Sequence, residues 1–174
     1  MGELQIRQVG YDHPDVGHLI TLVQGEYVKR YGGPDESPID PLDFRPPDGL
    51  FAVGYLDGNP VASGGWRRHP GDHPATGWAS PAAELKRMFV LDGYRGAGFA
   101  RAMLGYLEQE AALAGVRWLV LETGDQQPEA IALYHSSGYQ PVPPFGHYAD
   151  SPSSVHLGKE LMLPAAADDT EPAG

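Results

Sequence analysis

Six short segments of the chain have the apolar patterning that is typical of β-strands. Residues 3–9 alternate polar and apolar positions, which predicts a strand with one buried face. Residues 116–121 are predominantly apolar, as a central strand would be, and the tight turn 57–59 predicts a hairpin between the segments on either side. The expected strands are residues 3–9, 50–56, 61–67, 85–91, 116–121 and 155–163.

Three longer segments repeat their apolar residues at the helical period. Asp15 is suited to cap the first of them, Gly115 to stop the second, and Pro128 to stand in the first turn of the third. The expected helices are residues 15–31, 98–114 and 128–138.

Two irregular stretches and a polar tail separate or follow these elements. Residues 32–49 contain five prolines and five acidic residues, which is typical either of a lid or binding loop or of a disordered segment. Residues 69–82 form a second loop rich in proline and glycine. Residues 164–174 are acidic and bounded by proline, so we expect a disordered tail.

Composition and charge exclude several classes of protein. The 174 residues include no cysteine, which removes disulfide scaffolds, cysteine-ligated metals and cysteine nucleophiles, and makes a reducing cytoplasm the expected location. The histidines lack ligand spacing, so we expect no metal site. A net charge of −11 disfavours binding to nucleic acid. No apolar run approaches the ~18–20 residues of a membrane span, so we expect no membrane partner.

A glycine-rich turn opens the second helix, at Arg95-Gly96-Ala97-Gly98-Phe99-Ala100. Backbone N–H groups at the start of a helix point outward at the positive end of its dipole, where they can hold a phosphate. Residues 84–101 contain four basic and two acidic residues, in contrast to the acidic chain as a whole. The alternative is an ordinary tight turn, for which glycine is equally suited.

Two nucleotide motifs compete for this turn. A P-loop is excluded because no Gly-Lys-Ser/Thr follows. A dinucleotide fingerprint fits better, with Gly96 and Gly98 as its first pair and Glu122 at the distance of the ribose-binding acid. Against it, Arg101 occupies the third glycine position, and the fingerprint normally lies in the first βα unit.

Four motifs in a fixed order resemble the GNAT superfamily of acyl-CoA N-acyltransferases. They are Glu84-Leu-Lys-Arg-Met-Phe-Val90, Tyr94-Arg-Gly-Ala-Gly-Phe-Ala100, Leu121-Glu-Thr-Gly124 and Ala130-Ile-Ala-Leu-Tyr134, followed by Gly138-Tyr139. The resemblance covers residues 3–163, and its specific part is 84–139. It implies a single α/β domain with a mixed, mostly antiparallel sheet, which is splayed at the acetyl-CoA site and has helices on both faces.

The resemblance also implies a binding site for acetyl-CoA. In it the turn amides hold the pyrophosphate, strand residues bind the pantetheine arm, and a freed amide near Phe89 or Val90 polarises the thioester carbonyl. The implied cofactor-binding residues are Met88, Phe89, Val90, Arg95, Gly96, Ala97, Gly98, Phe99, Ala100, Arg101, Ala130, Leu133 and Tyr134.

Two side chains are candidates for proton transfer. Tyr134 aligns with the family's tyrosine that protonates the departing thiolate; the alternative is a packed helix aromatic. Glu84 is the candidate base for the attacking amine, with His147 or Tyr148 next, and its alternative role is an ion pair with a neighbouring cation. Because the chain has no cysteine, we expect direct transfer in a ternary complex.

The expected acceptor is a primary amine of a small molecule or peptide. Aromatic and acidic side chains suit such a substrate; the candidates are Glu26, Tyr27, Tyr31, Trp66, Glu84, His147 and Tyr148. Tyr27 and Trp66 could equally be core residues. A sensor that binds acyl-CoA without turnover and a nicotinamide-dependent oxidoreductase are the alternative functions, and the family also makes a homodimer plausible.

Overall fold

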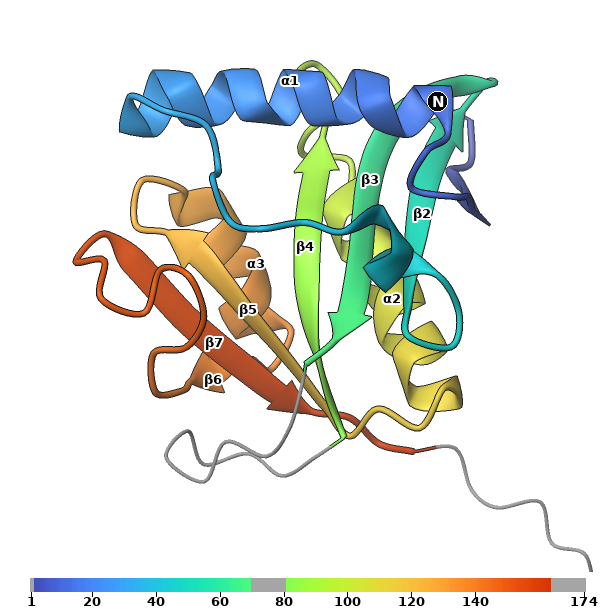
Figure 1. The fold of residues 1–174 in the computed structure, drawn as a ribbon. Helices are drawn as coiled ribbons and strands as arrows, with labels where there is room; N and C mark the ends of the chain where they lie inside the picture. Colours follow the sequence, from blue (N-terminus) through green and yellow to red (C-terminus); the bar gives the residue numbers. More distant parts are fainter. Residues whose placement is uncertain (1, 70–80, 164–174) are drawn as a thin grey trace, which may run out of the picture.

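The structure, a computed structural model, describes residues 2–69 and 81–163. In these ranges seven strands form one sheet in the order β1-β2-β3-β4-β5-β7-β6 (Figure 1). The strands are β1 Gln5–Gln8, β2 Gly49–Leu56, β3 Asn59–Arg68, β4 Ala82–Val90, β5 Trp118–Gly124, β6 Gln140–Pro141 and β7 Ser154–Glu160. The helices are α1 Pro14–Tyr31, the 3-10 helix η1 Pro41–Phe44, α2 Phe99–Leu113 and α3 Pro128–Ser136.

The six predicted strands and three predicted helices are all present, with small differences at their ends. The short strand β6 is additional. The first helix is capped by His13 rather than Asp15: the Nδ1 atom of His13 accepts a hydrogen bond from the N–H of Asp15 at 3.1 Å, and Pro14 takes the first helical position. The predicted tail 164–174 and most of the loop 69–82 lie outside the described residues.

Strands β4 and β5 are the one parallel pair in the described sheet, and they pair over three residues only. Ala82 lies opposite Trp118, and the register ends with Glu84 opposite Val120. Beyond this point the two strands diverge (Figure 1). This confirms the mixed, splayed sheet that the resemblance implies.

A bulge in β4 coincides with the start of this divergence. On β3, Ser63 and Gly65 are two positions apart, whereas their partners on β4, Phe89 and Lys86, are three positions apart. Arg87, within this interval, has a φ of +57°, which is uncommon for a residue with a side chain. The extra residue bends the strand, as bulges do.

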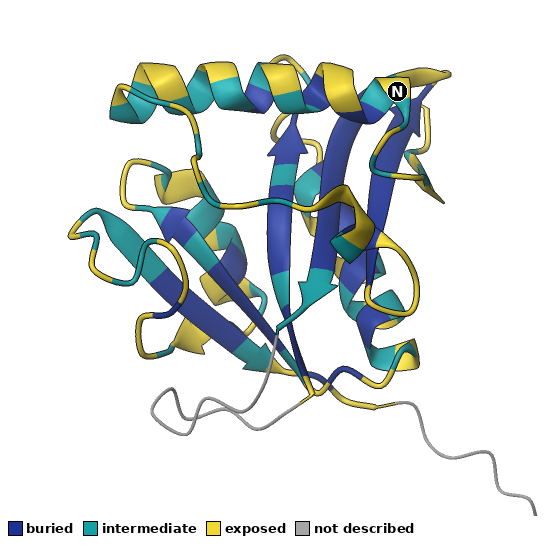
Figure 2. Cartoon of the chain, in the orientation of Figure 1, coloured by how far each residue is buried: buried dark blue, intermediate teal, exposed yellow. Residues whose placement is uncertain are grey.

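The sheet lies between α1 on one face and α2 with α3 on the other, as predicted (Figure 1). Most of the strand residues are buried, while α1 exposes its outer side (Figure 2). Gly64 lets α2 approach β3, because a Cβ there would stand 2.8 Å from Leu107 and 2.7 Å from the sulfur of Met88. No helix among the described residues is long and apolar enough to cross a membrane.

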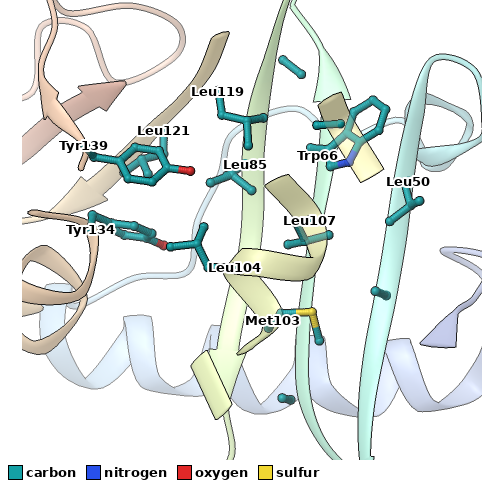
Figure 3. Close-up of a cluster of buried hydrophobic side chains, with 14 of the residues drawn as sticks. Leu50, Trp66, Leu85, Met103, Leu104, Leu107, Leu119, Leu121, Tyr134 and Tyr139 are labelled. Atoms are coloured by element: carbon teal, nitrogen blue, oxygen red, sulfur yellow. The ribbon is translucent and has the colours of Figure 1, made fainter. Parts of the chain in front are cut away.

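The inner face of α2 forms the main core with the sheet and α3 (Figure 3). Met103, Leu104 and Leu107 are at most 1% exposed. On the same helix Leu113 is 61% exposed and points away from this core.

We expect the substitution Leu107→Ala to lower the free energy of unfolding by roughly 2–5 kcal/mol, because it removes buried methyl groups and leaves a cavity. Leu113→Ala makes the same chemical change at an exposed position and should have little effect. Urea unfolding of both variants checks this. Equal losses would contradict the placement of α2 against the sheet.

Candidate functional site

A cavity of about 400 Å³ opens where β4 and β5 diverge. Its walls come from four parts of the chain: the middle of β4 with the end of β5, helix α3, the end of α1 with the loop after it, and the segment that leads into β7. Tyr27, Tyr31, Tyr134 and Tyr148 all line it. The splayed strands therefore enclose a real cavity with an aromatic lining.

The loop after α1 is anchored on the bulge of β4. The carboxylate of Asp35 accepts hydrogen bonds from Arg87 at 2.6 Å, from Lys86 at 3.4 Å and from the hydroxyl of Tyr148 at 3.0 Å. The side-chain amide of Gln24, on α1, hydrogen-bonds both the N–H and the carbonyl of Asp35. The sequence left open whether residues 32–49 form a binding loop or a disordered segment. The part around Asp35 is ordered and forms a wall of the cavity.

The surroundings of Asp35 determine its charge state. Burial by itself would raise the pKa of this carboxyl group, but Lys86, two hydrogen bonds from Ser37 and the guanidinium of Arg87 outweigh it. Together they hold the pKa of Asp35 well below its usual range. Asp35 is therefore ionised at neutral pH and forms ion pairs with Lys86 and Arg87.

The end of α1 is fixed to the segment between β5 and α3. The N–H of Gln126 donates to the hydroxyl of Tyr31 at 3.1 Å. Arg30 donates to the carbonyl of Gln126 at 2.8 Å and forms an ion pair with Glu129 at 2.7 Å. These contacts connect the two sides of the diverging strands across the cavity.

Tyr134 brings a buried hydroxyl-bearing ring to the cavity wall. Its ring stands edge-on to Tyr139 at 5.6 Å (Figure 3), and the hydroxyl of Tyr139 donates to Glu108 at 3.0 Å. Burial raises the pKa of Tyr134 far above its ordinary value, with a smaller contribution from Tyr27, and burial likewise raises the pKa of Tyr27 to about 12. Both hydroxyls therefore keep their protons at neutral pH.

The glycine-rich turn is exposed and folded as a phosphate-binding turn would be. Gly96 and Gly98 have φ values of +79° and +84°, and Gly98 is the N-cap of α2, where no side chain makes a capping hydrogen bond. The first turn of α2 contains no acidic residue. Arg95 is held by the carbonyl of Val90 and by an ion pair with Glu26.

Arg101 lies on the first turn of α2 and points towards α3. Its guanidinium donates to the hydroxyls of Ser136 at 2.7 Å and Ser137 at 3.2 Å. A positive charge is therefore fixed beside the glycine-rich turn, between the two helices.

A second cavity of about 620 Å³ adjoins the first. Lys86, Glu122 and Tyr148 line both. Glu84 lines only the second cavity, where it forms an ion pair with Arg67 at 3.4 Å and lies 4.0 Å from Lys86. The structure thus shows for Glu84 an ion pair with neighbouring cations, mainly with Arg67.

Glu122 is a functional candidate that the sequence motifs did not single out for this chemistry. It lies on β5 two residues beyond Val120, the last residue of that strand that pairs with β4, and no Lys or Arg of the described chain is within ion-pair distance of it. Burial raises the pKa of Glu122, although a hydrogen bond from Ser154 and the charge of Lys86 oppose this effect. The available signal was its place in the motif Leu121-Glu-Thr-Gly124.

The other predicted site residues fall into two groups. Met88, Ala130 and the tyrosines Tyr27, Tyr31 and Tyr148 line the first cavity, and His147 lines the second. By contrast, Trp66 is 2% exposed in the core and lines neither cavity, because its ring packs under α2. Glu26 is engaged by Arg95 and also lies outside both cavities. Neither position supports a contact with an acceptor.

Four core-facing members of the predicted cofactor set lie outside the first cavity. They are Phe89, Val90, Phe99 and Leu133. No group of three or more metal-binding side chains occurs in the described part of the chain.

Comparisons with known proteins agree on one family. Residues 18–139 match the model of the acetyltransferase (GNAT) family. The IAA acetyltransferase of Azospirillum brasilense is 44% identical over 78 residues, which cover 45% of this chain and 51% of that protein. The N-acetylaspartate synthetase of Rattus norvegicus is 30% identical over 129 residues, 74% of this chain and 40% of that protein. The match to this chain thus spans about half of the length of each of these relatives, or less.

Solved structures show the same fold. The GNAT domain of S. lividans PAT has a TM-score of 0.66 at 23% identity, covering 92% of each chain. A GNAT family acetyltransferase from Elizabethkingia anophelis, with acetyl-CoA bound, has a TM-score of 0.62 at 14% identity and covers 91% of this chain and 98% of its own.

We expect Asp35→Asn to lower stability by roughly 2–4 kcal/mol at pH 7, because two cations would lose their buried partner while some solvent contact softens the loss. The folded-state pKa of Asp35 is lowered, so its contribution is complete above the unfolded-state value of 3.8 and declines as the pH falls through the folded-state value. The difference from wild type should therefore shrink in acid.

Thermal unfolding at several pH values measures this difference. Asp57→Asn is the matched control, because Asp57 lies exposed in the β2–β3 turn. A gap between wild type and Asp35→Asn that does not depend on pH would contradict the ion-pair explanation.

Proposed function

The chain belongs to the acetyltransferase (GNAT) family, and we propose that it moves an acetyl group from acetyl-CoA to the primary amine of a small molecule or peptide. The observation that carries the proposal is the cavity between the diverging strands, with Tyr134 in its wall. The transfer is direct, within a ternary complex, because the chain has no cysteine to carry the acetyl group.

The donor site combines the glycine-rich turn with the space between β4 and β5. The N–H groups of the turn, at the positive end of α2, hold the pyrophosphate, and Arg101 adds a fixed positive charge there. The pantetheine arm lies between the strands, beside Met88 and Ala130. The acetyl-CoA bound to the related fold from Elizabethkingia anophelis supports this choice of cofactor.

Polar groups at the inner end of the cavity assist the reaction. A main-chain amide near Phe89 or Val90, next to the bulge, polarises the thioester carbonyl. Tyr134 gives its proton to the departing sulfur, and its raised pKa keeps that proton in place until the sulfur becomes negative. The dry surroundings that raise the pKa of the phenol also raise the basicity of a thiolate formed there.

The acceptor enters through the second cavity. With the donor arm in the first cavity, an acceptor in the second meets it where Lys86, Glu122 and Tyr148 line both. Acidic side chains at the second cavity favour a molecule that carries a positive amine.

The two alternative functions, a nicotinamide-dependent oxidoreductase and a sensor of acyl-CoA, make different predictions from acetyl transfer. A nicotinamide-binding fingerprint belongs to the first βα unit of a parallel sheet, whereas this glycine-rich turn follows β4 of a mixed sheet. A sensor would bind acetyl-CoA without transferring its acetyl group.

Titration calorimetry with acetyl-CoA, and with NADH as the control, tests the donor site. Release of free CoA thiol in the presence of primary amines then tests transfer. Binding of acetyl-CoA without any release would favour the sensor, and absence of binding would overturn the proposal.

We expect Tyr134→Phe to lower the turnover number roughly 100-fold or more, because the departing sulfur loses its proton donor. Acetyl-CoA affinity should stay close to that of the wild type, since the ring remains in place. Tyr106→Phe on α2, outside both cavities, is the matched control. Steady-state kinetics and calorimetry separate the two effects, and an unchanged turnover number would refute the role of Tyr134.

We expect Ala97→Glu to weaken acetyl-CoA binding roughly tenfold or more, because it sets a negative charge beside the pyrophosphate. Ala97 is exposed and, unlike its two glycine neighbours, has no positive φ, so the fold should tolerate the change. Ala97→Gln has a similar shape without the charge and should bind nearly as well as wild type. Similar losses in both variants would show that crowding, not charge, is responsible.

A further inference from the structure

The two cavities meet at one place, and a single carboxylate of the described chain lines both. Lys86 and Tyr148 share this position with Glu122. If the donor arm lies in the first cavity and the acceptor comes through the second, the attacking nitrogen must stand at this junction. A group that takes a proton from that nitrogen has to be within hydrogen-bond reach of it.

Each of the other carboxylates that line the two cavities either has an ion-pair or hydrogen-bond partner or is exposed to solvent. Asp35 is bound by Arg87 and Lys86, and Glu84 and Asp43 both pair with Arg67. Asp40 accepts the N–H of Leu42 as the cap of η1. Glu36 and Asp48 are exposed. Among the carboxylates that line the two cavities, Glu122 alone combines partial burial with the absence of an ion pair in the described residues.

Several elements present polar groups to Glu122. Lys86 is the nearby cation, and Glu84 and Asp35 are the nearby anions. The negative charge of Glu122 contributes to the raised pKa of the phenols of Tyr27 and Tyr148. From β7, Ser154 donates a hydrogen bond, and His156 lies directly opposite in register. Burial lowers the pKa of His156, whose Nε2 lies 3.2 Å from the carbonyl of Phe145, so this ring is neutral at pH 7.

We infer that Glu122 is the catalytic base of the reaction, which removes a proton from the acceptor's ammonium group at the junction of the two cavities. This inference rests on the proposed acetyl transfer. Glu122 replaces Glu84 in this role, because the carboxylate of Glu84 is held by Arg67 in the second cavity. Burial supports the assignment, because it raises the pKa of Glu122 and so makes its carboxylate a stronger base than an exposed one.

The proton balance of the step closes with two side chains. Glu122 takes one proton from the ammonium, and the freed lone pair attacks the thioester carbonyl carbon to form the new C–N bond. The C–S bond then breaks, its electron pair goes to sulfur, and Tyr134 protonates that sulfur. The second proton of the nitrogen passes through solvent to the phenolate of Tyr134, and Glu122 releases its own proton through the second cavity.

The experiment compares Glu122→Gln with wild type in acetyl-CoA binding and in turnover. Tyramine, spermidine, L-lysine and alanyl-alanine are the acceptors, and release of CoA thiol is the readout. We expect turnover to fall roughly 100-fold or more while acetyl-CoA affinity is retained. Glu110→Gln, on α2 and outside both cavities, removes one carboxylate as the matched control and should keep the wild-type rate.

The pH dependence of kcat/KM separates a base from a structural residue. In wild type the rate should rise with pH as Glu122 loses its proton, and in Glu122→Gln this limb should vanish, leaving only the ionisation of the amine. Ser154→Ala removes the hydrogen bond that lowers the pKa of Glu122, so the limb should move to higher pH.

A further acceptor provides a chemical test. Hydroxylamine is already neutral at pH 7, so the loss caused by Glu122→Gln should be smaller with hydroxylamine than with tyramine. An equal loss with both would point to damage of the site instead and would overturn the assignment.

The outcomes distinguish this inference from the proposed function. Undiminished turnover by Glu122→Gln, or a large loss confined to Glu84→Gln, would overturn the assignment of the base and leave acetyl transfer intact. If no amine is accepted, hydrolysis of acetyl-CoA is measured instead, since water must also lose a proton. Absence of both reactions in wild type would overturn the proposed function together with this inference.

Discussion

The divergence of β4 from β5 is the constraint on which the rest of the site depends. Parallel neighbours normally continue their pairing along the strand, but these two stop after Glu84 and Val120. The bulge at Arg87 bends β4, and Asp35 binds both Lys86 and Arg87 where the bend occurs. The cavity, the proposed path of the donor arm and the junction of the two cavities all follow from this geometry.

A buried ion cluster is an expensive way to hold a strand, because its charges lose their hydration. Its advantage here is specificity of position. Asp35 joins β4 to the loop after α1, Gln24 joins that loop to α1 itself, and Tyr148 joins it to the segment before β7. An apolar cluster of equal stability could not fix these directions, because dispersion contacts have no preferred partner. The cluster therefore stabilises one shape of the cavity.

The sequence predicts the elements better than it predicts the site. Hydrophobic periodicity identified all three helices, because one face of each must be buried. The predicted strand at 116–121 ended too early: the polar residue Glu122 and its neighbour resemble a strand end, yet β5 continues to Gly124 by pairing with β7. The resemblance implied a splayed sheet and a freed amide near Phe89 or Val90, but neither the position of the bulge at Arg87 nor the isolation of Glu122 could be predicted, because each depends on residues from distant segments. For Trp66 the sequence left a core position and a substrate contact equally open, because an aromatic residue at a strand end suits both; the structure places it in the core.

In the proposed reaction, one buried cavity serves both groups that move protons, the acid Tyr134 and the base Glu122, because burial affects both in a useful way. Desolvation raises the pKa of Tyr134 and of Glu122 alike, since it disfavours any anion. For the phenol the result is a proton retained until sulfur becomes negative. For the carboxylate the result is a stronger base than an exposed carboxylate would be. Because an uncompensated charge costs most in such surroundings, proton removal from nitrogen and proton delivery to sulfur must closely accompany the making and breaking of the two bonds.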